Sequence, residues 1–288
     1  MDQTTGYTKA TMNSGKVRNR GIELQLDGTP VKTKNFTWNS TFTWAKNYNK
    51  VLSLAAGLTD GQTIAYTGGT NCALIAKVGG SIGDIYGYKL KRAPDGQVVW
   101  KDGITARTTE FEYVGNAYPA WKAGFSNEFS YKNFRVSILF DGQWGGIVYS
   151  QTHHKMTEHG TLKHTLKYRE NPNFEVVGEG VMLDERGQYV PNNVPISVSK
   201  YYADYWRRAN VETNSFDASF LKLREARIEY TIPSAGLNKI GIERLTLALY
   251  GRNLAMWTKD FPVYDPEVAT LNNGTIVPGS EMGQLPST

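Results

Sequence analysis

The 288-residue chain has a net charge of +5 and one cysteine, so an internal disulfide and a multi-cysteine metal site are excluded. That cysteine, Cys72, is expected to lie in a loop. The basic residues are scattered rather than interleaved with aromatic residues, so nucleic acid is not an expected partner. There is no run of about 18 apolar residues, so the sequence predicts no spanning helix and only a β-barrel could cross a bilayer.

The first two predicted strands, residues 20–28 and 36–44, alternate between apolar and polar side chains. Their apolar positions are Ile22, Leu24, Leu26, Phe36, Trp38, Phe42 and Trp44. Their polar positions include Glu23, Gln25, Asp27, Thr37, Asn39 and Thr41. Burying this polar set in a dry core would be costly, so its face is expected to meet water.

A second hairpin is predicted at about residues 120–145, around a tight turn at Lys132 and Asn133. Its large apolar side chains again occupy alternate positions: Phe125, Phe129, Tyr131, Phe134, Val136, Ile138 and Phe140. Glu128 and Ser137 fall on the opposite face. A further strand-like segment covers residues 215–232, and the last alternates through Leu245, Leu247 and Leu249.

Short and long connections between these strands follow one another regularly. The turns at about 30–35, 132–133 and 233–241 are short, whereas the segments 45–119, 142–214 and 254–288 are long. The long segments are expected to be irregular, apart from a small hairpin at residues 94–96. Compact soluble domains seldom contain such loops, but outer-membrane barrels combine tight periplasmic turns with long extracellular loops. The predicted fold is therefore all-β, an antiparallel up-and-down transmembrane β-barrel segment of about six strands.

In such a barrel the apolar positions face lipid and the polar positions face the lumen. We expect lumen-facing side chains at Glu23, Gln25, Asn39, Thr41 and Glu128. Trp38, Trp44, Tyr131 and Trp144 are expected to form aromatic girdles at the lipid interfaces.

Four other groups suggest sites. His153, His154, His159 and His164 lie close together, but a polar, flexible stretch is the alternative to a metal site, and no metal site is predicted. Asp265 and Glu267 could offer ligands to Ca²⁺ or could belong to a solvated loop. The scattered carboxylates Glu23, Glu128, Glu225 and Glu229 have no nucleophile or oriented base beside them. No catalytic residue and no cofactor are therefore expected.

The aromatic group Tyr201, Tyr202, Tyr205 and Trp206 is the candidate substrate-binding surface. Sugars and peptides both stack on exposed rings, which offer rigid contact area at low entropic cost. The alternative is that these rings fix a long loop to the mouth of the barrel.

Several segments, taken in order, resemble the SusC/RagA group of TonB-dependent outer-membrane transporters. They are residues 15–24 (GKVRNRGIEL), 113–116 (YVGN), 125–127 (FSN), 131–134 (YKNF), 219–225 (SFLKLRE), 230–233 (YTIP), 251–254 (GRNL) and 257–258 (WT). The resemblance runs through nearly the whole chain and implies the C-terminal part, residues 1–288, of a barrel of about 22 strands. By the same comparison, the plug domain and the closing strand are expected to be missing.

The resemblance further implies an importer of oligosaccharides or peptides in the outer membrane, with a SusD-like surface lipoprotein and the TonB complex as partners and outer-membrane lipid around the barrel. The alternative function, from another class, is a surface or secreted β-rich carbohydrate-binding protein. The two differ in where the wide apolar face goes, because a barrel turns it to lipid whereas a sandwich packs two such faces together.

Overall fold

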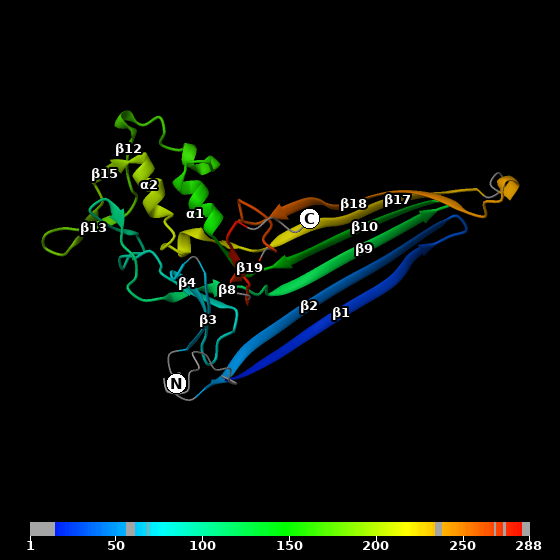
Figure 1. The fold of residues 1–288 in the computed structure, drawn as a ribbon, viewed down its shortest axis with the longest axis horizontal. Helices are drawn as coiled ribbons and strands as arrows, with labels where there is room; N and C mark the ends of the chain where they lie inside the picture. Colours follow the sequence, from blue (N-terminus) through cyan, green and yellow to red (C-terminus); the bar gives the residue numbers. More distant parts are fainter. Residues whose placement is uncertain are drawn as a thin grey trace, which may run out of the picture.

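The computed structural model describes residues 15–55, 61–67, 69–233, 238–267, 269–272 and 275–283. Its largest sheet is antiparallel and has six long strands, and it extends from a body of loops, short strands and two helices (Figure 1). The sheet is formed by β1 (Gly15–Lys32), β2 (Phe36–Leu54), β9 (Trp121–Tyr131), β10 (Phe134–Trp144), β17 (Phe220–Ile232) and β18 (Leu245–Thr258). Spatial order follows chain order, which confirms the predicted up-and-down arrangement.

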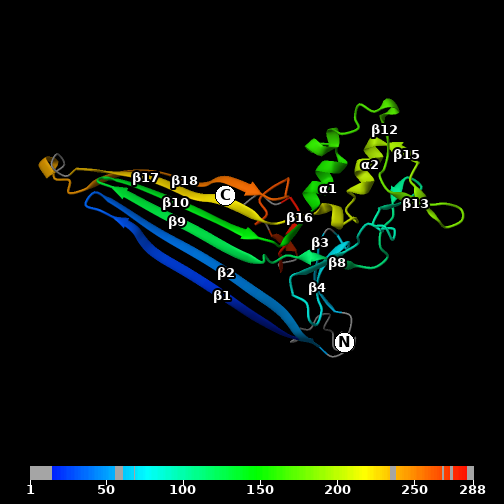
Figure 2. The same cartoon turned by 180° about the vertical axis from the view of Figure 1, so that it is seen from behind.

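The short and long connections lie at opposite ends of the sheet (Figures 1 and 2). At the narrow end, β9 turns into β10 through Lys132, whose φ of 50° lies in the left-handed region. The Lys132 backbone N–H donates to the carbonyl of Asn35 in the neighbouring turn, at 2.9 Å. The third turn, between β17 and β18, includes a short 3₁₀ helix, η5 (Asn238–Ile240), and its predicted tip at 234–236 lies outside the described residues.

The long connections are not irregular, contrary to the sequence-based expectation. The segment after β2 forms β3 (Gln62–Thr67), β4 (Cys72–Ala76), β5 (Asp84–Gly87), β6 (Val99–Lys101), β7 (Ile104–Thr105) and β8 (Glu112–Asn116). The segment after β10 forms β11 (Ile147–Ser150), α1 (Gln151–Glu158), η2 (Lys163–Leu166), η3 (Pro172–Phe174), β12 (Glu175–Val177), β13 (Val181–Leu183), β14 (Tyr189–Pro191), β15 (Pro195–Ser197), α2 (Val198–Tyr205), η4 (Glu212–Asn214) and β16 (Ser215–Asp217). The last segment adds β19 (Thr270–Asn272), β20 (Thr275–Val277) and β21 (Ser280–Glu281).

The predicted small hairpin at residues 94–96 is present, because Arg92 and Val98 pair across it. None of the helices in the described segments is long and apolar enough to cross a membrane.

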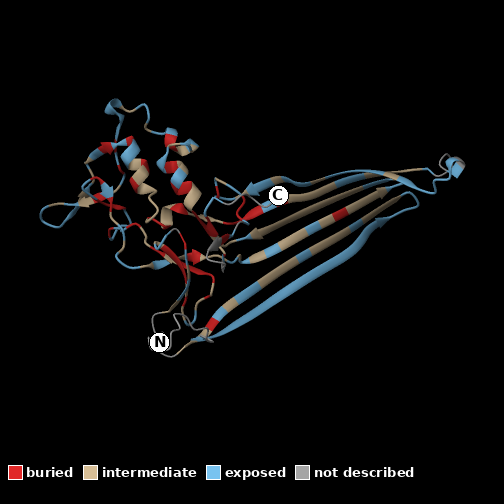
Figure 3. Cartoon of the chain, in the orientation of Figure 1, coloured by how far each residue is buried: buried red, intermediate tan, exposed pale blue. Residues whose placement is uncertain are grey.

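The buried core lies in the body rather than against the sheet (Figure 3). One cluster surrounds Trp100, and another contains Tyr149 and Cys72. Cys72 lies in β4 and is fully buried, so the expectation of a loop position was wrong. Burial raises the pKa of its thiol to about 12. Most side chains of the six-stranded sheet remain half-buried or exposed.

Candidate functional site

The pairing register separates the sheet into an apolar face and a polar face. Directly paired residues of antiparallel strands share a face. Rows such as Phe42–Phe125–Phe140–Leu223 are apolar, and the neighbouring row contains Thr41 and Ser126. All five residues predicted to face the lumen lie on the polar face: Glu23, Gln25, Asn39, Thr41 and Glu128. That this face lines a lumen stays a prediction.

Ion pairs connect strands across the turn-side part of the polar face. The guanidinium of Arg135 on β10 lies 3.8 Å from the Glu128 carboxylate on β9 and 3.9 Å from the Glu229 carboxylate on β17. Arg227 pairs with the same Glu229. These charges are partly exposed, so each pair contributes little to stability.

A second ionic cluster fixes the segment after β18 onto the polar face near the body. The ammonium of Lys222, buried on β17, lies 2.5 Å from the Asp265 carboxylate and also contacts Glu267. Arg224 bridges Glu267 at 2.8 Å and Asp141 of β10 at 2.6 Å. Burial opposes ionisation of Glu267, but hydrogen bonds from Lys222 and Arg224 outweigh it and hold its pKa below the ordinary range.

Of the two sequence-based interpretations, a solvated loop does not describe Asp265, which is buried and ion-paired, whereas Glu267 is ion-paired but remains exposed. The alternative, a Ca²⁺ site, has no supporting cluster, because no group of three or more metal-ligating side chains occurs among the described residues.

A cavity of about 460 Å³ opens at the body end of the sheet, beside this cluster. Its polar lining includes Glu23, Gln25, Lys122, Asp141 and Glu267. Two of these charged groups, Glu23 and Lys122, have no ion pair with any residue of the described segments. This opening combines ion-paired carboxylates, those of Asp141 and Glu267, with the unpaired charges of Glu23 and Lys122. It could therefore accommodate and orient a polar solute.

Aromatic side chains form two bands on the apolar face. Near the turns the first band contains Trp38, stacked on Phe129 at 5.8 Å, and Tyr131. Near the body, the second band contains Trp44, Trp121, Trp144 and Trp257, and Trp121 stacks on Trp144 at 6.3 Å. From Phe36 to Trp44 a strand extends about 27 Å along its own axis. At a tilt of about 40° the two aromatic bands are then about 21 Å apart along the barrel axis, which is close to the height of the apolar band of a transmembrane barrel.

The predicted substrate-binding aromatic group lies on and just after α2, where it packs against the core of the body. Tyr201 and Tyr205 stack on Trp100, both at 6.1 Å. Tyr202 is buried, and its hydroxyl donates to the carbonyls of His164 and Lys167 at 2.8 and 2.9 Å. These contacts are those expected of rings that fix a long loop. Substrate binding by Tyr201, Tyr202, Tyr205 and Trp206 stays a prediction, supported only by a small cavity of about 190 Å³ beside three of them.

Two of the four histidines, His153 and His154, lie in α1, His164 lies in η2, and His159 is the exposed residue that ends α1. His153 and His154 are buried in α1. His153 Nδ1 lies 2.9 Å from Asn214 Oδ1, and His154 Nδ1 lies 2.8 Å from the Trp206 carbonyl. His164 stacks on His153 at 5.3 Å. Burial lowers the pKa of His153 to about 4, so its ring is neutral at pH 7 and serves packing.

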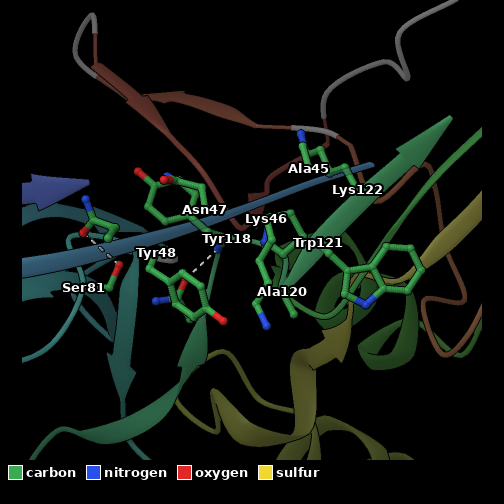
Figure 4. Close-up of a pocket in the computed structure, with 12 residues that line it drawn as sticks. Ala45, Lys46, Asn47, Tyr48, Ser81, Tyr118, Ala120, Trp121 and Lys122 are labelled. Carbon is green, nitrogen blue, oxygen red and sulfur yellow. Dashed lines mark hydrogen bonds between the residues drawn. The ribbon is translucent and has the colours of Figure 1, made fainter. Parts of the chain in front are cut away.

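Sequence reasoning did not identify the cavity of about 510 Å³ where β2 and the segment before β9 diverge (Figure 4). Its aromatic lining comes from Tyr48, Tyr118 and Trp121, and Lys46 and Lys122 add charge. The Asn49 amide oxygen on its edge accepts hydrogen bonds from Ser81 Oγ at 3.1 Å and from the Ile82 backbone at 2.9 Å. No sequence signal marked this cavity, because residues 45–50 have no apolar alternation.

Comparison with known proteins identifies relatives along nearly the whole chain, although no family model matches. The chain is 29% identical to TonB-dependent receptor P26 of Formosa agariphila over 98% of its length and 29% of that protein. It is 24% identical to TonB-dependent receptor P3 of the same organism, over 95% of the chain and 27% of that protein. TonB-dependent receptor SusC of Bacteroides thetaiotaomicron matches half of the chain (51%) and 16% of its own length, at 26% identity.

Solved structures show the same fold. The RagAB peptide importer in its closed-closed state superimposes with a TM-score of 0.63 and 20% identity, covering 99% of this chain and 30% of that chain. The RagAB peptide transporter gives a TM-score of 0.60 at 20% identity, covering 92% and 28%. The chain is thus related to the TonB-dependent receptors, and its resemblance to the SusC/RagA group is confirmed. It spans 30% or less of the length of each of these relatives.

Proposed function

We propose that this chain forms part of the wall of an outer-membrane importer, as the C-terminal portion of its barrel. The observation that carries the proposal is the register, which gathers the apolar side chains of six consecutive strands on one face and the polar ones on the other. A barrel wall requires such a division, with lipid on one side and a wet lumen on the other.

The edges of the sheet support a place within a larger barrel. β1 and β18 each pair on one side only among the described residues. An unpaired edge in hydrocarbon would leave backbone groups unsatisfied at a cost of several kcal/mol each. Neighbouring strands in a larger barrel would satisfy both edges.

The transported solute is proposed to be a peptide or an oligosaccharide. Its uptake would be driven by TonB, with a SusD-like lipoprotein on the body side. The support is the relatedness to a receptor named SusC and the fold shared with an importer named for peptides. The relatives named here are receptors and transporters, and no enzymatic role is proposed.

A secreted carbohydrate-binding protein, the other candidate, has less support. Such a protein would cover the apolar face with a second sheet. In the described part of this chain, Leu24, Phe125 and Leu249 on that face remain 44%, 43% and 76% exposed. The buried clusters lie in the body instead.

Single-cysteine labelling of the full-length importer tests the proposal. Leu249→Cys and Ile138→Cys on the apolar face should react with a lipid-soluble maleimide and resist a charged one in intact outer membranes. Thr41→Cys and Ser126→Cys on the polar face should show the reverse preference. Labelling of all four by the charged reagent would indicate a soluble or peripheral protein.

A further inference from the structure

The apolar face carries charge at only one place. Between the register shifts of β1 and β2, and along the other four strands, the charged side chains at described register positions of this face are Arg18 and Arg20 of β1 and Lys46 and Lys50 of β2; Lys16 lies beyond the shift at residues 16–17. All four are basic, and no aspartate or glutamate occupies a register position on that face. They lie together at the body end, next to the last apolar rows. We call them the basic patch.

The basic patch is unfavourable for the isolated sheet. Arg18 is paired directly opposite Lys50, and Lys46 lies diagonally from Arg20. Like charges placed directly across two strands destabilise the pair. No ion pair to any of the four occurs within the described segments. An external anion would remove this repulsion.

The position of the patch indicates which anion. Ile22 pairs with Lys46, and the next apolar row toward the turns pairs Leu24 with Trp44. The basic patch therefore begins where the second aromatic band, the one near the body, ends. Lys46 lies ten residues above Phe36, about 33 Å along the strand, or about 25 Å of height at a tilt of about 40°. This is the full height of a barrel's apolar band, so Lys46 lies where the lipid headgroups begin on the body side, and Arg20, Arg18 and Lys50 lie within about 10 Å beyond it.

The side chains between the charges suit a headgroup region. Tyr48 lies between Lys46 and Lys50 on the same face and is 57% exposed, and the Lys46 ammonium lies 4.8 Å from its ring centre. Tyrosine and tryptophan concentrate at such interfaces because their rings are amphipathic. Basic residues there attract anionic lipids.

We propose that the basic patch binds the phosphate groups of an anionic lipid in the leaflet that faces the body. The lipid chains would lie along Leu24, Trp44 and the rows below them. The proposal rests on the membrane placement under Proposed function. It adds a specific lipid contact, confined to β1 and β2, to a wall whose other four strands carry no charge on this face in the described part.

Native mass spectrometry of the full-length importer, released from detergent, tests the patch. The probe is lipid A with two phosphates, titrated against the parent, the triple variant R18Q/R20Q/K50Q and a control, K32Q/K34Q/K132Q. The control removes three exposed lysines at the turn end, so the change in net charge is the same. Because each basic residue near a charged lipid surface contributes about a fivefold effect, the triple variant should bind about a hundredfold more weakly and the control within twofold.

Equal weakening of the two triple variants, or lipid A binding unchanged in R18Q/R20Q/K50Q, would overturn the proposal. So would inorganic phosphate displacing lipid A at low millimolar concentration, because the site would then be one for a free anion. K50Q alone, expected to weaken binding about fivefold, keeps the test available if the triple variant does not assemble. Fractionation of cells that express the parent tests the proposed function separately from the lipid contact. If the parent protein were absent from the outer-membrane fraction, the proposed function would be refuted, and the lipid contact would not be the cause.

Discussion

Placing one arginine at different positions of the sheet tests whether the apolar face meets lipid. Ile138 lies midway between the two aromatic bands, opposite Asn127 and Ala226. Leu24 lies on the same face at the level of Trp44, in the second aromatic band near the body. Thr41 lies on the polar face, where its hydroxyl donates to the Asp27 carboxylate at 2.7 Å. The three variants are Ile138→Arg, Leu24→Arg and Thr41→Arg.

The depth of each position sets the expected cost. An arginine at the bilayer midplane of a barrel costs about 2–4 kcal/mol, and the cost falls to about 0–1 kcal/mol near the interfaces. Ile138→Arg should therefore destabilise the importer by about 2–4 kcal/mol and Leu24→Arg by about 1 kcal/mol. Thr41→Arg should cost less than 1 kcal/mol, because Asp27 can pair with the new guanidinium.

The measurement is the free energy of unfolding of the full-length importer in lipid vesicles, from reversible urea titrations. Ile138→Leu serves as the control for local packing, with an expected cost below about 1.5 kcal/mol. The expected cost of an arginine therefore depends on depth on the apolar face and not on the polar face. If Thr41→Arg costs as much as Ile138→Arg, the polar face does not meet water and the barrel assignment is wrong.

Three further predictions concern the body and its attachment. Tyr202→Phe should destabilise α2 by about 1–2 kcal/mol, because the carbonyls of His164 and Lys167 lose their common donor; hydrogen exchange at 163–167 measures this. Lys222→Met should detach residues 259–267 from the sheet at a cost of about 3 kcal/mol, because Asp265 loses its buried partner. Faster proteolysis of that segment is the readout, and an unchanged cleavage rate would contradict this prediction. The folded pKa of His153 is about 4, below its ordinary value near 6.5, so α1 should lose stability as the pH falls from 6.5 to 4, and His153→Gln should flatten that dependence in hydrogen exchange.

The sheet was predictable because each of its strands alternates apolar and polar side chains with a period of two. The alternation at Ile22, Leu24 and Leu26 and its equivalents fixed the strands, their faces and the turns between them. Strand ends were less predictable. β2 continues to Leu54, ten residues past its expected end at Trp44. Residues 45–50 do not alternate between apolar and polar side chains, so the pattern did not mark them as part of the strand.

The body was not predictable, because its core joins residues far apart in the sequence. Trp100 of β6 contacts Tyr201 and Tyr205 of α2, and Val176 and Ile196 complete the cluster. Its strands of two to six residues are too short to show a period. The high aromatic content did not indicate where each ring lies, because aromatic residues occur both in the core of the body and on the apolar face of the sheet. Trp100 and Trp206 pack in the body, whereas the other five tryptophans lie on the apolar face.

The polar face also indicates which side chains a transported solute would meet. Most of its charges are already engaged: Arg135 with two glutamates, and Lys222 and Arg224 with Asp265, Glu267 and Asp141. Substituting an engaged residue perturbs the wall as well as the solute path.

Lys122 differs, because it lines the cavities of about 460 and 510 Å³ and has no ion pair within the described segments. Lumen substitutions in barrels tune selectivity rather than stability. Lys122→Gln should therefore change the relative uptake of acidic and basic peptides or sugars in cells at least severalfold, with unfolding in lipid unchanged within about 0.5 kcal/mol. Arg224→Gln, the matched control, should lower stability and uptake together. If Lys122→Gln left the acidic-to-basic uptake ratio unchanged, the solute path would not pass this part of the wall.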